Sequence, residues 1–429
     1  MRILHLIQRF WPARGGAESH LGTISRHLTN MGHEVTVATT DALDFELFWE
    51  PRRRRVPEHR SEESGLTIRR FRVRHLPAST LAYPAVRRLL WLLSAARPIP
   101  EAAMHPLARL TPWTPDLWQW LETTDEPFDL VAGMTICFEP ILEAGLRFAQ
   151  RRDIPFVIYP LVHLGAGAEP GDDPLSRFYT MRHQNALVRA SSAIVAQTPA
   201  EKSYYAARGV PEERIHVVGP GVDAEAVLGG DGPRFRERHV ISGPIVLSLS
   251  STSYDKGTVH TVEAVRALWR AGRQVELVLA GAVLEPFRRY LGTLPAEERQ
   301  RIHLLGTIEE QEKRDLLAAC DMLVMPSRTD SFGIVYLEAW LYRKPVVGAR
   351  TWGVMDVIED GQDGLLVPFA DVEALSGAIA HLLDNPDEAA AMGARGEAKV
   401  YQHHLWSAKL ARIEQLYTEL VQEHARAHP

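Results

Sequence analysis

Short apolar runs alternate with stretches of helical periodicity along the first half of the chain. Apolar runs bounded by Gly, Pro and Asp are typical of buried parallel strands. We expect strands near residues 2–7, 34–39, 66–73, 128–133, 155–161, 193–197 and 214–218. Between the first two, Leu21, Ile24 and Leu28 fall on one face of a predicted helix. This pattern predicts parallel strands connected by helices.

The second half restarts the same alternation after a stretch, 223–243, that is rich in loop-forming residues such as those of 229–233. We expect strands at 245–249, 275–279, 302–305, 322–325 and 345–347, with helices near 257–271, 309–319 and 332–342. Alternating strands and helices predict parallel sheets with helices on both faces. The fold class is therefore α/β, with two doubly wound domains over 1–222 and 223–404.

A last helix is predicted over 405–429. Trp406, Leu410, Ile413, Tyr417 and Leu420 form one apolar stripe along it. Such a stripe needs a partner surface, and we expect the helix to pack back on the N-terminal domain.

Bulk composition excludes several classes of protein. The chain has 429 residues, a formal net charge of −6 and two distant cysteines, Cys137 and Cys320. This charge does not favour nucleic acid, and the cysteines form neither a metal cluster nor a disulfide framework. We see no secretion signal and no run near the roughly 18 apolar residues of a spanning helix. We therefore expect a cytoplasmic protein.

The segment 326–339 carries the most specific chemistry. It follows a predicted strand and opens a helix, and ligands of open α/β sheets bind where strands end. The free N–H groups of a helix N-terminus suit a phosphate, and Gly333 lets the backbone approach it. Asp330 can accept hydrogen bonds from a sugar, and Glu338 from a ribose. Alone, the segment is equally compatible with a capping Asp and a solvated Glu.

Several motifs in order resemble the retaining, two-domain glycosyltransferases of family four, which have the GT-B fold. The segment from Asp330 to Glu338 resembles the acidic-x7-Glu signature of that family. Further similar motifs are Gly15-Gly16-Ala17-Glu18, Gly32-His33-Glu34, Gly219-Pro220-Gly221, Lys256-Gly257, Lys344-Pro345 and the run 361–367.

The resemblance implies roles for matching residues. Lys256 would neutralise the leaving diphosphate, Asp330 would hold the donor sugar, and His163 would lie beside the transferred sugar. These three are the predicted catalytic residues. The predicted donor-binding set is Gly15, Gly16, Lys256, Ser331, Phe332, Gly333 and Glu338. We see no Asp-x-Asp motif and expect neither a metal nor a cofactor.

Three departures from the family pattern stand out. The family often has an Arg shortly before its lysine, but the run 248–255 has none. The first acidic residue of the acidic-x7-Glu signature is usually a Glu in the family, whereas here it is Asp330. The family's usual Gly-Gly-x-x-Glu is Trp352-Gly353-Val354-Met355-Asp356. The missing Arg removes a positive charge that would stabilise the departing diphosphate.

The resemblance implies a retaining hexosyltransferase that moves a sugar from a nucleotide-diphosphate sugar to a glycan, lipid-linked or small-molecule acceptor, as in cell-envelope polysaccharide synthesis. The alternatives are another GT-B protein, such as a sugar-nucleotide epimerase, and a non-catalytic glycan-binding scaffold. The base, the sugar, the acceptor and the oligomeric state stay open.

The stretch 51–97 is unusually basic. It holds twelve Arg, including Arg52 to Arg55 and Arg97, against three Glu, and Leu and Trp91 follow at 89–93. Arg beside Leu and Trp suits a membrane interface. The alternative is a solvated Arg loop followed by a helix packed on the core. The first interpretation predicts docking on an anionic bilayer at the inner face of the membrane.

Overall fold

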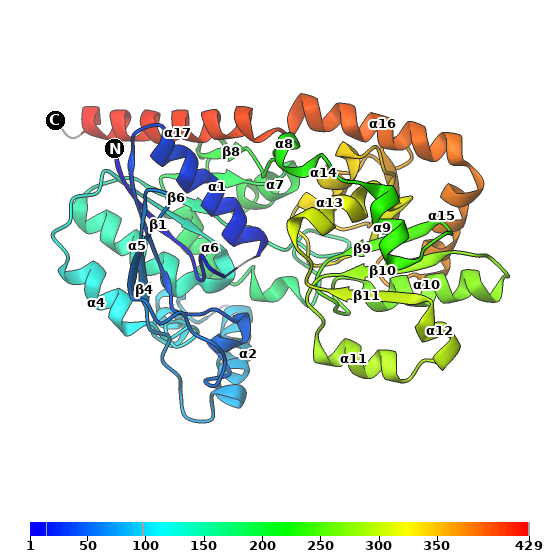
Figure 1. Cartoon of the computed structure of the whole chain (residues 1–429). Helices are drawn as coiled ribbons and strands as arrows, with labels where there is room; N and C mark the ends of the chain where they lie inside the picture. The colour runs from blue at the N-terminus through cyan, green and yellow to red at the C-terminus, as the bar shows by residue number, and fades with distance from the viewer. Residues whose placement is uncertain (14, 97, 428–429) are drawn as a thin grey trace. The chain divides into compact units, whose positions relative to one another are not determined.

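The structure is a computed structural model that describes residues 1–13, 15–96 and 98–427. Contacts divide the chain into two compact units (Figure 1). The first unit comprises Met1–Val162, Pro174–Gly219 and Lys409–Pro429, and the second comprises His163–Asp173 and Pro220–Ala408. Arg97 and the last two residues of the helix predicted over 405–429 lie outside the described residues.

The first unit is built on an eight-stranded sheet in the order β3-β4-β2-β1-β5-β6-β7-β8. Its strands are β1 (Arg2–Leu6), β2 (Glu34–Thr40), β3 (Arg60–Glu63), β4 (Leu66–Phe71), β5 (Leu130–Met134), β6 (Phe156–Tyr159), β7 (Ala193–Ala196) and β8 (Ile215–Val217). All neighbours are parallel except β3 and β4. The seven predicted strands are present. The edge strand β3 was not predicted because its residues are polar and mostly exposed.

Helices cover this sheet. The longer ones are α1 (Gly16–Asn30), α2 (Ser79–Ala95), α4 (Pro115–Thr123), α5 (Glu139–Arg152), α6 (Arg182–Arg189) and α7 (Pro199–Ala206). The remaining short turns are α3 (His105–Ala108), η1 (Phe45–Phe48), η2 (Glu101–Met104), η3 (Ile136–Phe138), η4 (Ser176–Phe178) and η5 (Glu212–Arg214). As the periodicity predicts, Leu21, Ile24 and Leu28 of α1 are fully buried.

The second unit is built on a six-stranded parallel sheet in the order β11-β10-β9-β12-β13-β14. Its strands are β9 (Ile245–Leu249), β10 (Glu276–Ala280), β11 (Ile302–Gly306), β12 (Met322–Met325), β13 (Val346–Ala349) and β14 (Gly364–Val367). The helices are α8 (Ala224–Val227), α9 (Gly232–His239), α10 (Thr258–Arg270), α11 (Glu285–Gly292), α12 (Ala296–Gln300), α13 (Glu310–Ala319), α14 (Ile334–Leu341), η6 (Val354–Asp356), α15 (Val372–Asp384) and α16 (Pro386–His403).

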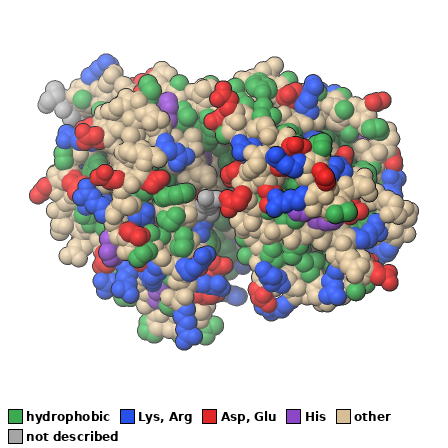
Figure 2. Space-filling view, viewed as in Figure 1, with side chains coloured by type: hydrophobic (Ala, Val, Ile, Leu, Met, Phe, Trp, Pro, Cys, Tyr) green, Lys and Arg blue, Asp and Glu red, His purple; other side chains and the backbone are tan. Residues whose placement is uncertain are grey.

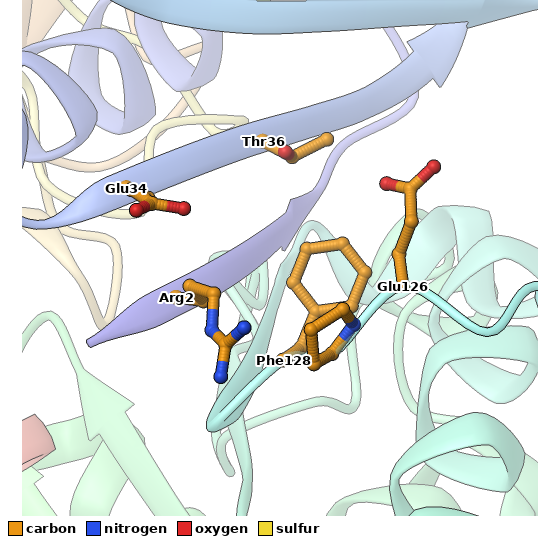
Figure 3. Close-up of a pocket in the computed structure, with 6 residues that line it drawn as sticks. Arg2, Glu34, Thr36, Glu126 and Phe128 are labelled. Carbon is orange, nitrogen blue, oxygen red and sulfur yellow. The ribbon is translucent and has the colours of Figure 1, made fainter.

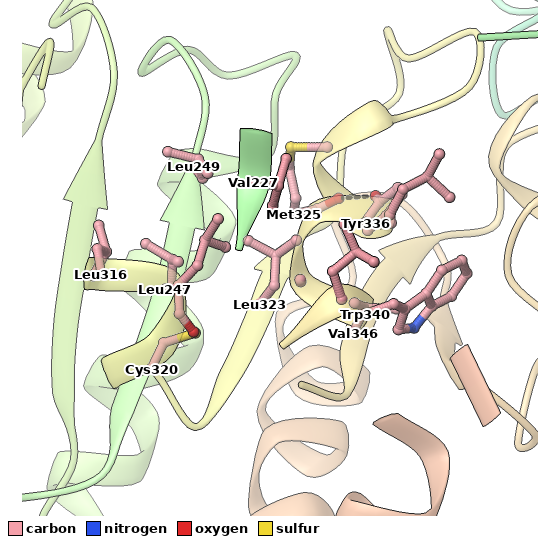
Figure 4. Packing of buried hydrophobic residues seen from close by; sticks show 14 of the residues in the cluster. Val227, Leu247, Leu249, Leu316, Cys320, Leu323, Met325, Tyr336, Trp340 and Val346 are labelled. Carbon is pink, nitrogen blue, oxygen red and sulfur yellow. Dashed lines mark hydrogen bonds between the residues drawn. The ribbon is translucent and has the colours of Figure 1, made fainter. Parts of the chain in front are cut away.

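One core of this unit lies between the sheet and α14. Figure 4 shows Leu247, Leu323 and Val346, from three neighbouring strands, packed with Tyr336 and Trp340 of the helix. All five are fully buried. This packing fixes α14, and therefore its N-terminus, against the strand β12 that precedes it.

The stretch 223–243, predicted as loop-rich, in fact contains the helices α8 and α9. The side chain of Asp231 accepts a hydrogen bond from the backbone N–H of Arg234, and Pro233 occupies the first turn of α9. A capping Asp followed by Pro is a signal for the start of a helix. Gly229 and Gly230 are loop residues, as predicted, but the prediction of a loop was wrong from Gly232 to His239.

The last helix, α17 (Trp406–Ala427), belongs to the first unit from Lys409 onward. Leu410, Ile413 and Tyr417 of its predicted stripe are buried. The Tyr417 hydroxyl lies 2.9 Å from that of Tyr159 on β6 and 3.4 Å from Nε2 of His5 on β1. The stripe is therefore seated against the first sheet.

Candidate functional site

The predicted catalytic residues of the second unit lie at the point where the order of strand addition in its sheet reverses, between β9 and β12. The chain builds β9, β10 and β11 toward one edge and then returns to add β12 on the other side of β9. Ligands of open α/β sheets bind at such a switch point, outside the carboxyl ends of the strands. Lys256 follows β9 and Asp330 follows β12, so both side chains come from adjacent strand ends.

Lys256 and Asp330 form an ion pair. Lys256 Nζ lies 2.8 Å from Asp330 Oδ1, and the two side chains are 25% and 15% exposed. Burial by itself would raise the pKa of the Asp330 carboxyl, but the charge and hydrogen bond of Lys256 outweigh it and hold the pKa below its usual value. The site therefore contains an ionised carboxylate and an ammonium group in contact.

His163 joins this pair. It opens the segment of residues 163–173, which clusters with the second unit. Desolvation by burial and, to a smaller extent, the charge of Lys256 lower the pKa of His163 to about 4, although the charge of Asp330 opposes this shift. A hydrogen bond with the backbone of Thr329 also involves this ring. His163 is therefore neutral at physiological pH, and the structure brings all three predicted catalytic residues together.

Two helix N-termini open at the same sheet edge. Gly257 caps α10 and Gly333 caps α14, and neither helix receives a side-chain hydrogen bond at its cap. Gly257 has φ of +78°, and a Cβ there would collide with the carbonyl oxygen of Pro326. Only glycine fits that position. The uncapped N–H groups suit an anionic ligand.

The remaining residues of the α14 loop differ in what they can offer. Ser331 is half-buried. The side chain of Phe332 is 5% exposed and packs against the ring of His404, with 5.6 Å between ring centroids. Phe332 can therefore meet a ligand only through its backbone.

Glu338 has a partner that the sequence did not reveal. Its Oε1 lies 3.0 Å from Nζ of Lys313 on α13. Burial raises the pKa of Glu338, and the charge of Lys313 opposes that rise. No periodicity or motif connects positions 313 and 338, because the contact forms only when α13 and α14 pack on the same sheet.

A basic residue lies near the position of the missing family Arg, but it is already paired. Arg328 Nη2 lies 2.7 Å from Asp255 Oδ1, and the Arg328 backbone N–H donates to the carbonyl of Asp255 at 2.9 Å. Its guanidinium also lies 5.0 Å from the centre of the Phe369 ring. These contacts hold the loop that carries Lys256 against the loop that carries Asp330.

Gly15 and Gly16 open α1 at the switch point of the first sheet, between β1 and β5. Gly15 packs against an ion pair, in which Arg9 Nε lies 2.8 Å from Glu18 Oε1. Gly16 has open space around its Cα. The structure therefore puts the predicted glycine loop at a third helix N-terminus, that of α1, within the first unit.

A shallow pocket lies at the opposite end of the first sheet. It is lined by Arg2, Glu34, Thr36 and residues 126–128, at the start of β1 and β2 (Figure 3). Ligands of such sheets bind at the carboxyl ends of strands, so this pocket is not the expected substrate site. Among the described residues, no group of three or more His, Cys, Asp or Glu is arranged to hold a metal ion.

Family models match both units. The model described as glycosyl transferases group 1 matches residues 233–399, and the glycosyl transferase 4-like domain matches residues 15–221. A D-inositol 3-phosphate glycosyltransferase from Xylanimonas cellulosilytica is 30% identical over 294 residues, which are 65% of this chain and 69% of that protein. The chain belongs to the group 1 glycosyltransferases.

Other relatives of this group 1 glycosyltransferase match over shorter regions. An α-D-kanosaminyltransferase from Streptomyces kanamyceticus is 29% identical over 226 residues, half of this chain and 56% of its own length. A GDP-mannose-dependent α-(1-6)-phosphatidylinositol monomannoside mannosyltransferase from Mycolicibacterium smegmatis is 31% identical over 229 residues, half of this chain and 59% of its own length. The chain thus spans little more than half the length of these two relatives.

Solved structures share the fold over the whole chain. Sucrose-phosphate synthase from Thermosynechococcus elongatus has a TM-score of 0.73 at 18% identity, covering 98% of this chain and 99% of that one. HepE from Anabaena in complex with UDP-glucose has a TM-score of 0.70 at 21% identity, covering 98% and 100%. This group 1 glycosyltransferase therefore has the predicted GT-B fold.

Proposed function

We propose that the chain transfers a sugar from a nucleoside-diphosphate sugar to an acceptor hydroxyl, with retention of anomeric configuration. The observation that carries the proposal is the meeting of Lys256, Asp330 and neutral His163 beside two uncapped helix N-termini. A GDP-mannose-dependent relative and a structural neighbour in complex with UDP-glucose support a nucleotide sugar as donor. They differ in base, so the base stays open.

The chemistry follows from where charge develops. As the glycosidic bond breaks, the sugar becomes cation-like and negative charge grows on the departing diphosphate. This negative charge is stabilised by the N-termini of α10 and α14 and by the ammonium group of Lys256. Asp330 accepts hydrogen bonds from sugar hydroxyls and balances Lys256 in the free protein. His163 carries no charge at neutral pH, so its ring acts as a hydrogen-bonding group beside the sugar rather than as an acid.

A donor screen tests this function. UDP, GDP, ADP and their hexose derivatives would be compared by thermal unfolding and by slow hydrolysis of the donor in the absence of acceptor. A ligand at a hundredfold excess over its Kd stabilises the folded state by about 2.7 kcal/mol. Stabilisation with hydrolysis supports the enzyme. Stabilisation without hydrolysis would favour a non-catalytic binding protein, and no stabilisation by any donor would remove both.

We expect the first product to keep the anomeric configuration of the donor. The support is membership of the family. Proton NMR of the product, recorded before mutarotation, measures the configuration directly. An inverted product would exclude the chain from the retaining enzymes.

We also propose that the protein docks on an anionic bilayer, and that α2 is the element that contacts it. Leu81, Leu89 and Leu92 lie on one face of α2 and are 74%, 45% and 49% exposed, with exposed Arg88 among them. Apolar and basic side chains gather at the lower edge of the first unit, where α2 is drawn (Figure 2). Apolar residues with a flanking Arg suit the membrane interface. No helix among the described residues is long and apolar enough to cross a bilayer.

The ion pairs of the Arg run, residues 52–55, make this run a weaker candidate for the membrane contact than the sequence suggested. Arg53, Arg54 and Arg55 pair with Glu50, Asp44 and Asp41 at 2.6, 2.7 and 2.5 Å, so much of the local positive charge is balanced. Trp91 is half-buried, and the guanidinium of Arg177 lies 4.6 Å from its ring centre. The exposed leucines of α2 are therefore a better contact surface than the Arg run or Trp91.

Replacing Leu81, Leu89 and Leu92 together with Ser should abolish most co-sedimentation with vesicles that contain anionic lipid. Each buried apolar side chain contributes about 1.5–3 kcal/mol, and salt does not screen this contribution. Changing Arg52 to Arg55 to Ser should have a smaller effect. A wild-type protein that stays in the supernatant with both neutral and anionic vesicles would contradict docking altogether.

A further inference from the structure

Trp352 stands where the family pattern has its first glycine, and its contacts give it a specific task. It follows β13 and precedes η6. Its backbone N–H donates to the carbonyl of Gly165 at 3.2 Å, and its indole Nε1–H donates to the carbonyl of Gly167 at 3.0 Å. Both acceptors belong to the segment of residues 163–173, which begins with His163.

The neighbouring residue contacts the other side of the site. A Cβ on Gly353 would lie 2.5 Å from the carbonyl oxygen of Ser331 and 3.0 Å from that of Asp330. Backbone atoms meet there, so only glycine allows the approach. Trp352 therefore contacts the loop that carries His163, and Gly353 contacts the loop that carries Asp330.

The 163–173 segment needs such an attachment. The residues before it, on β6, and after it, from Pro174, both cluster with the first unit, whereas the segment itself clusters with the second. Within the segment, the N–H of Gly171 donates to the carbonyl of Leu164 at 2.9 Å, which closes the loop on itself but does not attach it to another element. The two hydrogen bonds from Trp352 attach the loop at Gly165 and Gly167, in addition to the hydrogen bond between the His163 ring and the backbone of Thr329.

We propose that Trp352 is a positioning residue that fastens the His163 loop to the donor-binding unit and so keeps His163 beside Lys256 and Asp330. A glycine at position 352 would keep the backbone hydrogen bond but lose the one from the indole. The inference rests on the proposed function for its catalytic consequence, because a fastened loop matters to turnover only if His163 lies beside the reacting sugar. The position of the loop itself can be measured without any activity.

Trp352→Phe tests the proposal, because it keeps a six-membered aromatic ring and removes the five-membered ring of the indole together with its N–H. The chain offers a matched control in Trp269→Phe. Trp269 Nε1 donates to the backbone carbonyl of Val275 at 2.8 Å, in the same unit but at the C-terminal end of α10. Both variants lose one indole-to-carbonyl hydrogen bond, so their thermal stability should fall by similar amounts.

Two readouts distinguish positioning from general stabilisation. The first is NMR titration of His163, whose pKa is lowered to about 4 by desolvation and by Lys256. Loosening of the loop in Trp352→Phe should move this pKa upward, and Trp352→Gly should move it further toward 6.5. The second is donor hydrolysis at saturation, which should fall about two- to tenfold in Trp352→Phe, the range of one hydrogen bond. Trp269→Phe should change neither.

The outcomes are separable. A His163 titration and a turnover that match the wild type in both Trp352 variants would overturn the proposal. Equal losses of turnover in Trp352→Phe and Trp269→Phe, with an unmoved His163 pKa, would overturn it too, because they would reduce Trp352 to a stabilising residue. If the wild type neither binds nor hydrolyses any donor, the proposed function fails, and the His163 titration alone decides whether Trp352 holds the loop.

Discussion

Replacing Lys256 with Ala should lower turnover at saturating donor by about 10²–10³-fold, the cost of removing one group that stabilises developing negative charge. The Kd for the donor should change much less. The charge on the departing diphosphate grows as the bond breaks, so the contact with Lys256 is stronger in the transition state than in the ground state. The effect should be large here because the nearby Arg328 already pairs with Asp255 at 2.7 Å.

Two further variants make this result specific. Lys256→Arg keeps the charge and should retain more turnover than Lys256→Ala. Lys399→Ala removes another lysine of the same unit that pairs with an aspartate, Asp363, and should leave turnover unchanged at any temperature where the protein is folded. The pKa of Asp330 should rise in Lys256→Ala, since the ammonium group that holds it down is gone. A weaker Kd with unchanged turnover at saturation would show that Lys256 only binds.

Replacing Glu338 with Ala should raise the Kd for the nucleotide about tenfold or more, as measured by calorimetry with UDP, GDP and ADP. A hydrogen bond to a charged group contributes about 1.5–3 kcal/mol, and this carboxylate is expected to accept from the ribose. The variant also leaves the ammonium of Lys313 without the carboxylate that lies 3.0 Å away. The double variant Glu338→Ala with Lys313→Met removes that stranded charge and should bind nucleotide as weakly as Glu338→Ala.

The pH dependence of nucleotide binding provides an internal check. The pKa of Glu338 is raised by burial, so acidification should protonate it at a higher pH than an ordinary glutamate. The ionised form is the better acceptor, and affinity should therefore fall as the pH drops through this raised pKa. Glu338→Gln should remove that dependence. A Kd in Glu338→Ala equal to that of the wild type would withdraw the ribose assignment.

The fold follows from the sequence because its signals are local. The strands β9 and β12 occur at the predicted residues, and α10, α13 and α14 begin within two residues of the predicted starts. Among the elements that were not predicted, β3 and α9 have residues that do not show an apolar period. The strand β3 is polar on an exposed edge, and α9 begins with Gly232 and Pro233, which also signal loops.

The site was predictable only in part. Lys256, Asp330 and Glu338 were proposed because they lie after strand ends, or on the helix that follows one, at a spacing that a known family shares. Their partners were not found, because they depend on packing between distant segments. Lys313 lies on another helix than Glu338, and Trp352 meets the His163 loop across 185 positions of sequence. The ion pairs that neutralise Arg53 to Arg55 were not predicted for the same reason. Arg55, for example, pairs with Asp41 on an adjoining loop.

The packing of α17 bears on the order in which the protein folds during synthesis. The first unit draws its last helix from residues that follow Lys409, whereas its sheet is finished at β8, before Gly219. At about 5–20 residues per second, roughly 10–40 s separate these two points on the ribosome. Through that interval Tyr159 lacks its hydroxyl partner Tyr417, and the apolar surface that Leu410 and Ile413 will cover faces water. The first unit therefore remains without its last helix until nearly all of the second unit, which emerges in the meantime, has been synthesised.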